Sequence, residues 1–266
     1  MKKALIILLS ACLFASCQPS DEELAKGCIE RGGLLIAQGE WNAALNTLDS
    51  VDTMFPKLVS ARREAKFLKD SIGYMQALRS LEYTDSQLLI AEPKLDSLLN
   101  LFELQKDEKY QTEGTLLSRR FMSSGNSERT FLQASVSEKG QSFVRSVYYG
   151  SKPLNHTDLS IAAAEDATTH VTAIKAPHVF DNHEFLTFDG DNAMELLKFV
   201  ANHEREKLKV TISGDSQFSY FITAGDATAL TQTYELALAF SDVNTLRRNA
   251  DAAQFTIAKW KNQPTK

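Results

Sequence analysis

The sequence predicts an α+β protein with a helical N-terminal part and an antiparallel sheet that is packed by a long C-terminal helix. Between residues 22 and 118, apolar residues recur every three or four positions, which is the spacing of one helix face. From residue 131 the period shortens to two, as in strands with one buried face. A last helical pattern covers 226–261, which is too long for one small sheet. We therefore expect this helix to return along the N-terminal helices.

The first residues are typical of a signal peptide. Two lysines precede an apolar run that ends at Ala15, and this run is shorter than the roughly 20 residues of a membrane-spanning helix. Small residues lead directly into Cys17, with Phe14 before them, and this resembles the lipobox of bacterial lipoproteins. The resemblance implies that residues 1–16 are removed and that the Cys17 thiol is acylated. The alternative is an ordinary signal peptide with an incidental cysteine.

Residues 17–24 are predicted to form an acidic tether. The run from Ser20 to Glu23 resembles the export signal of Bacteroidota-type lipoproteins, which implies the outer face of the cell outer membrane. The alternative is a solvated tether whose acidity is incidental. Each buried methylene contributes about 0.8 kcal/mol, so two or more acyl chains hold a protein stably at a membrane. We expect a lipid-anchored, surface-exposed protein of the outer membrane.

Charge and cysteine content narrow the choice of function. The net charge is −5, and loss of the signal peptide removes two lysines and no acidic residue. We therefore expect no nucleic-acid partner, because such proteins need a basic surface. With Cys12 removed and Cys17 acylated, Cys28 has no disulfide partner and no companion for a metal. We interpret Cys28 as a small apolar residue near a helix start.

Residues 25–58 resemble a single tetratricopeptide repeat. In a 34-residue frame that has Cys28 at its fourth position, the matching residues are Gly32, Gly39, Trp41, Ala44 and Pro56. The resemblance implies a helical hairpin in which Gly32 and Ala44 allow close approach and Pro56 ends the second helix. One repeat cannot bury its own apolar face, so it must pack on another part of the chain. We do not expect a peptide-binding solenoid.

The remainder of the helical region, 25–118, is predicted to be a coiled stalk. Helical spacing covers 60–80 and again 86–111, and Pro93 marks a start or a kink. We expect these two segments to form an antiparallel pair with wet Lys- and Glu-rich faces. The polar run 119–130 interrupts the periodicity and is interpreted as a linker.

The last region, 131–266, is predicted to contain the sheet. Two hairpins are expected, one turning at Gly140 with a positive φ and one at Gly214–Asp215. Further strands are expected at 158–162, 169–175 and 183–188, followed by a helix over 192–204. That helix should cover the apolar face of the sheet, and Asp226 should cap the last helix.

The densest group of ionisable side chains lies in "HVFDNHEF", which begins at His178, with His170 upstream. A metal site would need several of these side chains to converge. In a single strand, however, His178 and His183 would point to opposite faces. Surface turn residues are the simpler interpretation, and an incidental metal site is the alternative.

Other motifs fail when their spacing is checked. "DGDN", from Asp189, begins like a calcium-binding EF-hand loop, but Met194 and Val200 stand where glycine and glutamate are required. "SGDS", from Ser213, lacks the surrounding glycines of a nucleophile elbow and suits a hairpin turn. No glycine-rich phosphate loop is present. An aromatic platform for sugars could be formed by Tyr148, Tyr149 and Tyr220, although strand tyrosines are often half-buried sheet residues.

The sequence therefore predicts a non-enzymatic lipoprotein with no cofactor and no metal. The leading hypothesis is a scaffold or protein-interaction module of the cell envelope, with a protein partner. A surface protein that binds glycans or other nutrients is the alternative, and a hydrolytic enzyme comes third. Aromatic side chains on one exposed sheet face would favour glycan binding, and an apolar stripe on the helices would favour a protein partner. Convergence of His178, His183 and acidic side chains in a cleft would favour an enzyme.

Replacement of Cys17 by alanine tests the lipid anchor. We expect the Cys17→Ala protein to move from the membrane fraction to the soluble fraction, because the acylated thiol is lost. Fractionation of cells followed by immunoblotting measures this change. Cys28→Ala is the control and should stay with the membrane. Membrane association of a processed Cys17→Ala protein would contradict the lipoprotein hypothesis.

Overall fold

The computed structural model describes residues 19–122, 128–163 and 167–262. The predicted signal peptide, 1–16, and the predicted lipidation site, Cys17, lie outside these ranges. Residues 123–127, in the middle of the expected linker, also lie outside them.

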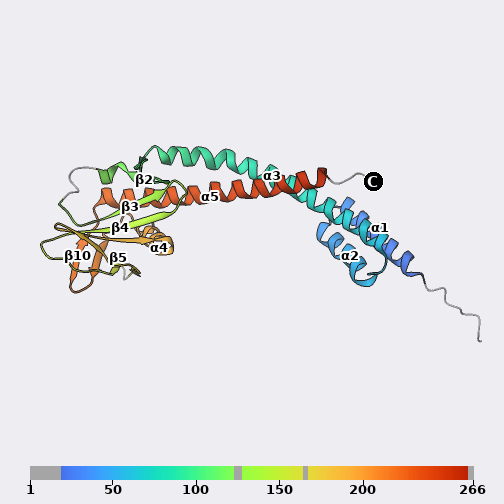
Figure 1. The fold of residues 1–266 in the computed structure, drawn as a ribbon, viewed down its shortest axis with the longest axis horizontal. Helices are drawn as coiled ribbons and strands as arrows, with labels where there is room; N and C mark the ends of the chain where they lie inside the picture. Colours follow the sequence, from blue (N-terminus) through green and yellow to red (C-terminus); the bar gives the residue numbers. More distant parts are fainter. Residues whose placement is uncertain (1–18, 123–127, 164–166, 263–266) are drawn as a thin grey trace, which may run out of the picture. The chain divides into compact units, whose positions relative to one another are not determined.

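The chain divides into two compact units, whose elements are labelled in Figure 1. The helical unit contains the residues up to Tyr83 and those from Asn249 onward, and the sheet unit is Thr84–Arg248. Two helices, α3 (Val59–Leu99) and α5 (Ala224–Lys261), contribute residues to both units. The predicted α+β class, with antiparallel strands and a long C-terminal helix, is confirmed. Within the described ranges, none of the helices has the length and apolar composition that crossing a membrane requires.

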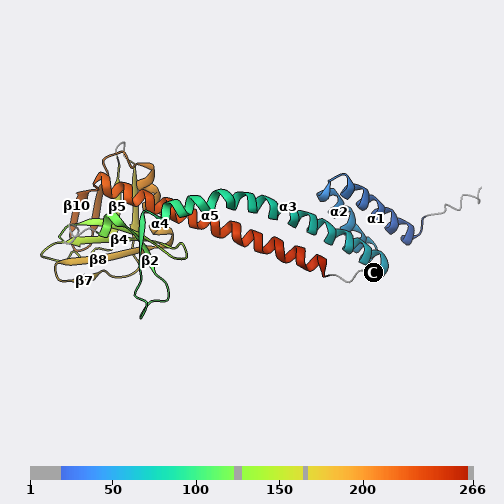
Figure 2. The same ribbon diagram turned by 90° about the horizontal axis from the view of Figure 1, so that it is seen from above.

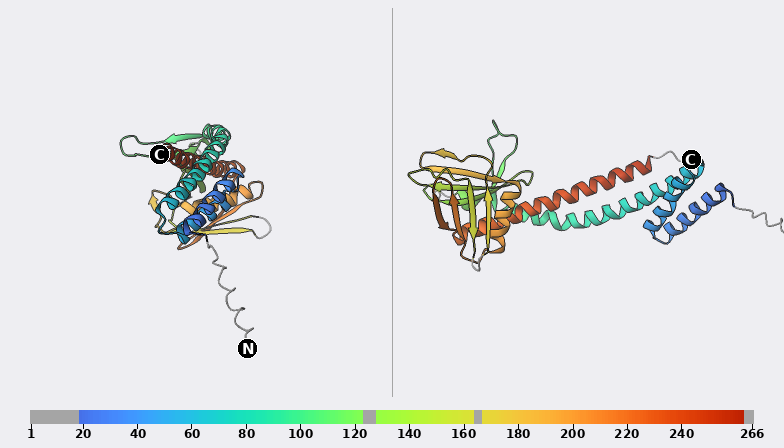
Figure 3. Two further views of the ribbon diagram at one scale, coloured as in Figure 1. Left: turned by 90° about the vertical axis from the view of Figure 1, so that its right-hand side faces the viewer. Right: turned by 90° about the horizontal axis from the view of Figure 1, so that it is seen from below.

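In the helical unit, α1 (Asp21–Ala37) and α2 (Trp41–Met54) form the expected hairpin (Figure 3). Gly39 has a φ of +80° at the turn, a conformation that glycine adopts without strain. A Cβ atom on Gly32 would lie 2.6 Å from Cδ2 of Leu48. The predicted close approach of the two helices at Gly32 is therefore confirmed, and a larger residue there would force them apart.

The predicted tether is shorter than 17–24, because α1 begins at Asp21. The Ser20 hydroxyl accepts a hydrogen bond from the Glu23 N–H (3.2 Å), and the Glu23 carboxylate accepts one from the Ser20 N–H (3.0 Å). This reciprocal pair is a capping box. The acidic residues that suggested a tether also occupy the first turn, where the helix dipole favours negative charge.

The apolar face of the hairpin packs on the first part of α3. Leu48 of α2 and Ala65 and Ile72 of α3 are fully buried in one core. At the edge of this core, the Arg79 guanidinium lies 4.2 Å from the centroid of the Trp41 ring. The α3 helix thus supplies the surface that a single repeat-like hairpin needs for its stability.

The end of α5 contacts the same part of α3. The Trp260 ring lies against Phe67 and Tyr74, at centroid distances of 5.0 and 5.7 Å. Ile257 and Ala253, about one and two turns earlier, are buried against α3. An exposed helix end gains nothing from such residues, so these contacts fix the last turns of α5 within the helical unit.

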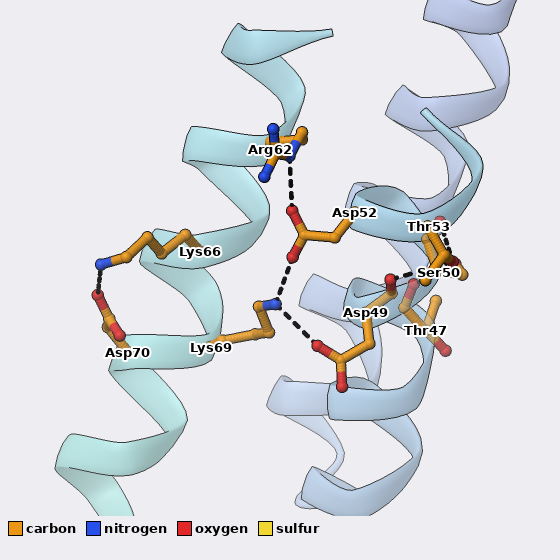
Figure 4. A network of polar contacts seen from close by, with 9 residues as sticks. All are labelled: Thr47, Asp49, Ser50, Asp52, Thr53, Arg62, Lys66, Lys69 and Asp70. Atoms are coloured by element: carbon orange, nitrogen blue, oxygen red, sulfur yellow. Dashed lines mark hydrogen bonds and ion pairs between the residues drawn. The ribbon is translucent and has the colours of Figure 1, made fainter. Parts of the chain in front are cut away.

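A charge network joins α2 to α3 (Figure 4). The Lys69 ammonium lies 2.7 Å from one carboxylate oxygen of Asp49 and 2.7 Å from one of Asp52. Arg62 binds the other oxygen of Asp52 at 2.9 Å. Hydrogen bonds from Lys69 and Arg62 lower the pKa of Asp52. Burial lowers the pKa of Lys69, but its hydrogen bonds with both carboxylates outweigh burial and raise the pKa.

The expectation of two helices over 60–80 and 86–111 is wrong, because α3 is one unbroken helix from Val59 to Leu99. The intervening "EYTD" contains no glycine or proline, so nothing in the backbone ends the helix there. Thr84 is only 2% exposed, and Pro93 lies within the helix.

The prediction that the chain is helical as far as residue 118 is also wrong. Strands β1 (Phe102–Gln105) and β2 (Thr115–Ser118) pair as an antiparallel hairpin. Their apolar residues fit either period, and tertiary contacts decide between them. Phe102 and Leu116 are buried in one cluster with Val136 and with Leu236 and Val243 of α5.

The sheet unit contains two antiparallel sheets where one was expected (Figure 2). Sheet A has the order β1-β2-β3-β4-β8-β7, with β3 Phe131–Ser137, β4 Ser142–Tyr149, β7 His178–Phe180 and β8 His183–Asp189. Sheet B has the order β10-β9-β5-β6, with β5 Asp158–Ala162, β6 Thr168–Thr172, β9 Lys209–Ser213 and β10 Gln217–Phe221. The second sheet forms because β5 pairs with β6 and β9, not with β4.

The main core lies between the sheets and α4 (Gly190–Asn202). Sheet A contributes one set of alternating residues, such as Ala134 and Leu186, and sheet B contributes Leu159 and Ile212. The α4 helix packs on β4, β8 and β6, and its buried Leu196 enters the same core. The predicted cover of the sheet by a helix in this region is confirmed.

The predicted turn at Gly140 and the predicted cap of the last helix have different outcomes. Gly140 has a φ of +90° between β3 and β4, as predicted, and a Cβ there would lie 2.7 Å from Cβ of Phe240. The cap of α5, in contrast, is Thr223, whose hydroxyl accepts the Asp226 N–H at 3.2 Å. The Asp226 carboxylate instead binds Arg129 (2.6 Å) and Arg120 (3.1 Å), so the prediction that it caps the helix is wrong. Two nearby guanidinium groups outcompete a backbone amide for a carboxylate.

Replacement of Lys69 by methionine should destabilise the helical unit by about 1 kcal/mol, since two carboxylates lose their shared cation. Both tryptophans of the chain, Trp41 and Trp260, lie in this unit, so tryptophan fluorescence during urea unfolding reports on it selectively. Lys66→Met is the matched control, because its pair with Asp70 is an exposed i,i+4 contact worth about 0.3 kcal/mol. Equal effects of the two substitutions would show that the network does not stabilise the contact between α2 and α3.

Candidate functional site

A groove of about 760 Å³ lies on the outer face of sheet A, the face opposite to the one that carries Ala134, Val144 and Leu186. Two cross-strand rows form its floor. One row is Leu117, Ser135 and Phe143, and the other is Gln133, Arg145 and Thr187. These residues alternate with the buried inner-face residues, so strand periodicity puts them on one face, and the pairing register aligns them in rows.

One wall of the groove comes from β1 and from the loop that follows it. This loop projects beyond the sheet (Figure 2), and Gln105, Lys106, Asp107 and Gln111 line the groove. Within the loop, the Gln111 side chain accepts the Asp107 N–H at 2.9 Å, and Asp107 accepts the Lys109 N–H at 3.0 Å. The loop therefore has a defined conformation of its own.

The loop is also fastened to the turn between β3 and β4. The Glu138 carboxylate accepts the Gly114 N–H at 2.6 Å and lies 3.2 Å from the Lys106 ammonium. These two donors, the amide first, lower the pKa of Glu138. A second ion pair, Lys139 with Glu113 at 2.7 Å, lowers the pKa of Glu113. The wall is thus held to the floor while these carboxylates are ionised.

Arg145 stands at the centre of the floor on β4, which lies between β3 and β8. Its side chain is exposed. Among the residues that the structure describes, none forms a hydrogen bond or an ion pair with its guanidinium group. Arg145 is therefore a fixed positive charge whose five N–H donors are available to a ligand.

Aromatic side chains continue along the same face toward the β7 edge. The His183 ring stacks on Phe185 with an interplanar angle of 8° and lies 5.0 Å from Tyr149, between centroids. The register pairs Phe180 with His183, and Phe180 is 70% exposed. The outer face therefore combines a polar groove with an aromatic strip, which we define as Tyr149, Phe180, His183 and Phe185.

The expectation that His178 and His183 point to opposite faces is wrong. They lie on adjacent antiparallel strands joined at Asp181, which has a φ of +52°. His178 pairs with Phe185, so both histidines share the outer face. Glu184 points to the opposite, inner face. Within the described ranges, no group of three or more potential metal ligands converges.

On the inner face, Glu184 belongs to a buried polar network that the sequence did not reveal. Its carboxylate accepts the N–H groups of Leu154, Asn155 and His156 at 2.7, 3.0 and 2.7 Å. The His156 Nδ1 atom also binds Glu184, and its Nε2 atom lies 3.0 Å from the Ser146 hydroxyl. Burial lowers the pKa of His156 more than Glu184 raises it, which favours a neutral imidazole.

The order serine, histidine, glutamate is that of a hydrolase triad, but its setting differs. Ser146 and His156 are 0% exposed, and Glu184 is 1% exposed. A nucleophile must reach a substrate carbonyl, and a hydroxyl without exposed surface cannot do so in this conformation. We assign the network a structural role. It holds the strap, residues 150–157, that carries the chain from sheet A to sheet B.

The strap also contacts the turn of the "SGDS" motif. The Asp215 N–H donates to the Leu154 carbonyl at 2.8 Å, and the Asn155 amide donates to the Asp215 carboxylate at 2.7 Å. A Cβ on Gly214 would lie 2.4 Å from the carbonyl oxygens of both strap residues. This motif is therefore a hairpin turn that packs on the strap, and the prediction of a turn is confirmed.

The remaining predicted residues are dispersed. The three tyrosines do not form one platform, because Tyr148 lies on the inner face against Phe218 of sheet B, and the Tyr220 hydroxyl is buried on β10. "DGDN" forms the start of α4. His170 lies on β6 and contacts Asp158 at 3.3 Å. Cys28 is half-buried in α1.

Comparison with models of known protein families, with characterised proteins and with solved structures finds no match to this chain.

Replacement of Glu184 by glutamine should destabilise the sheet unit by about 3 kcal/mol, because the strap amides lose a buried carboxylate and face an NH₂ group instead. Hydrogen exchange of the amides at 154–156 should become faster. Urea unfolding, measured by circular dichroism, should have its midpoint at a lower urea concentration. Glu103→Gln, on an exposed strand position of the same sheet, should leave both unchanged. Unaltered exchange at 154–156 in Glu184→Gln would contradict the structural role.

Proposed function

We propose that this chain is a lipid-anchored, non-enzymatic glycan-binding protein of the outer membrane, which binds its ligand on the outer face of sheet A. The observation that carries the proposal is the groove of about 760 Å³, whose volume suits a small polar ligand. The predicted anchor at Cys17 would hold this surface at the cell envelope, where glycans are abundant.

The chemistry of the lining supports a sugar ligand. Amide groups come from Gln105, Gln111 and Gln133, and hydroxyl groups come from Thr115, Ser135 and Thr187. Each of these groups can donate and accept, as the hydroxyl groups of a sugar also do. Phe143 and Leu117 offer apolar surface to the C–H face of a sugar ring. The aromatic strip extends this surface beyond the groove.

The groove is better suited to binding than to hydrolysis. Glycoside hydrolysis uses two carboxyl groups on either side of the scissile bond. Among the described lining residues, Asp107 alone has a carboxyl group, and one of its oxygens accepts a backbone N–H. Floor residues on paired strands are also preorganised, which lowers the entropy cost of binding.

A protein-interaction scaffold is the second candidate. Leu89 and Ile90, neighbours on α3 in the sheet unit, are 79% and 68% exposed. Adjacent exposed apolar side chains favour contact with a protein. A partner bound at α3 would be insensitive to substitutions in the groove, so the experiment below separates the two candidates.

Binding of oligosaccharides to the full chain, measured by isothermal titration calorimetry after a glycan-array screen, tests the proposal. Gln133→Ala and Phe143→Ala should each weaken binding about tenfold, equivalent to about 1.4 kcal/mol, because each removes one contact from the floor. Gln217→Ala, on a strand of sheet B, is the matched control and should bind normally. Absence of glycan binding, or binding that both floor substitutions leave unchanged, would overturn the proposal.

A further inference from the structure

We propose that the glycan is acidic and that Arg145 binds the carboxylate of a uronic acid unit. This inference rests on the proposed function and names the chemical class of its ligand. Its basis is the position of Arg145 on the groove floor, its lack of a partner among the described residues, and the amide and hydroxyl groups of Gln133 and Thr187 on either side of it.

Some described arginines form ion pairs and others, such as Arg63 and Arg205, have no partner among the described residues, so what distinguishes Arg145 is its place on the groove floor. Arg129 binds Asp226 at 2.6 Å, Arg247 binds Glu92 at 2.7 Å, and Arg62 binds Asp52 at 2.9 Å. In a chain with a net charge of −5, acidic residues are plentiful, yet none of the described ones pairs with Arg145. An arginine at the centre of a groove floor with no internal anion is available to an external one.

The surroundings of Arg145 define the anion further. The register places Gln133 and Thr187 on either side of it, at cross-strand distances of about 5 Å. A carboxylate can accept two parallel hydrogen bonds from the guanidinium group. The Gln133 amide and the Thr187 hydroxyl can then form hydrogen bonds with the sugar hydroxyl groups next to the carboxylate. The other cation of the lining, Lys106, is already engaged by Glu138.

Aromatic rings favour a sugar acid over a simple anion. Phe143 lies two residues before Arg145 on β4, and Phe185 lies two residues before Thr187 on β8, so both share the outer face. A uronic acid carries a carboxylate at one edge and an apolar C–H face, and both features would meet their counterparts here. A free phosphate or an acetate ion would use the arginine alone.

Calorimetry with matched oligosaccharides tests the inference. The probes are oligomers of galacturonate, glucuronate and mannuronate, and the same oligomers after reduction of the carboxyl group to an alcohol. The full chain should bind at least one acidic oligomer at least tenfold more tightly than its reduced form, and this preference should fall as salt concentration rises. Sulfated neutral oligosaccharides are included to show whether the anion must be a carboxylate.

Arg145→Gln should abolish the preference for the acidic form while retaining binding of the reduced form, and Arg145→Lys should restore only part of it, because an ammonium group lacks the bidentate geometry. Lys209→Gln, on β9 of sheet B, makes the same change in charge and should keep the preference. Thermal unfolding confirms that the variants fold.

The outcomes separate the two proposals. Equal binding of acidic and reduced oligomers, or a tighter response to sulfated ones, would overturn the uronic acid assignment and leave glycan binding intact. A preference that survives Arg145→Gln would overturn the role of Arg145. Failure of every oligosaccharide, acidic or neutral, to bind would overturn both the inference and the proposed function.

Discussion

The buried carboxylate of Glu184 is the interaction on which the sheet unit depends. Three consecutive backbone N–H groups and the His156 ring converge on it, and together they offset the cost of removing a charge from water. The carboxylate thereby fixes the strap at the point where the chain leaves sheet A for sheet B. Because the strap also packs on Gly214 and Asp215, the same contact sets the turn between β9 and β10.

Because this buried network uses only inward-pointing side chains, the two faces of sheet A have different roles. Ser146 and Glu184, the polar residues of the network on strands, point inward and satisfy each other through His156. The neighbouring residues on β4 and β8 point outward and take no part in this network. Arg145, next to Ser146, points outward into the groove and has no partner among the described residues, which is why we propose it as the group that binds the anion of the ligand. A rigid inner face is what keeps the outer rows in register.

Much of the fold follows from local patterns, whereas the candidate site does not. Gly32, Gly140 and the alternation in β9 predicted a close contact, a positive φ and a strand correctly. The strands β1 and β2 were missed because their apolar residues fit two periods and only burial against α5 decides between them. The groove draws residues from 105 to 187 into two rows, and the pairing register that aligns them has no local signal. His178 and His183 show the same limit, since the tight turn at Asp181 places them on two paired strands and thereby on the same face.

Hydrogen exchange of the full chain, with and without a saturating uronic acid oligomer, tests the central claim most directly. The account predicts slower exchange in peptides covering 105–117, 133–145 and 183–187, which form the groove and the adjoining aromatic strip, and unchanged exchange in 209–221 of sheet B. Slower exchange in sheet B or around Leu89 and Ile90, with none on the outer face of sheet A, would contradict it.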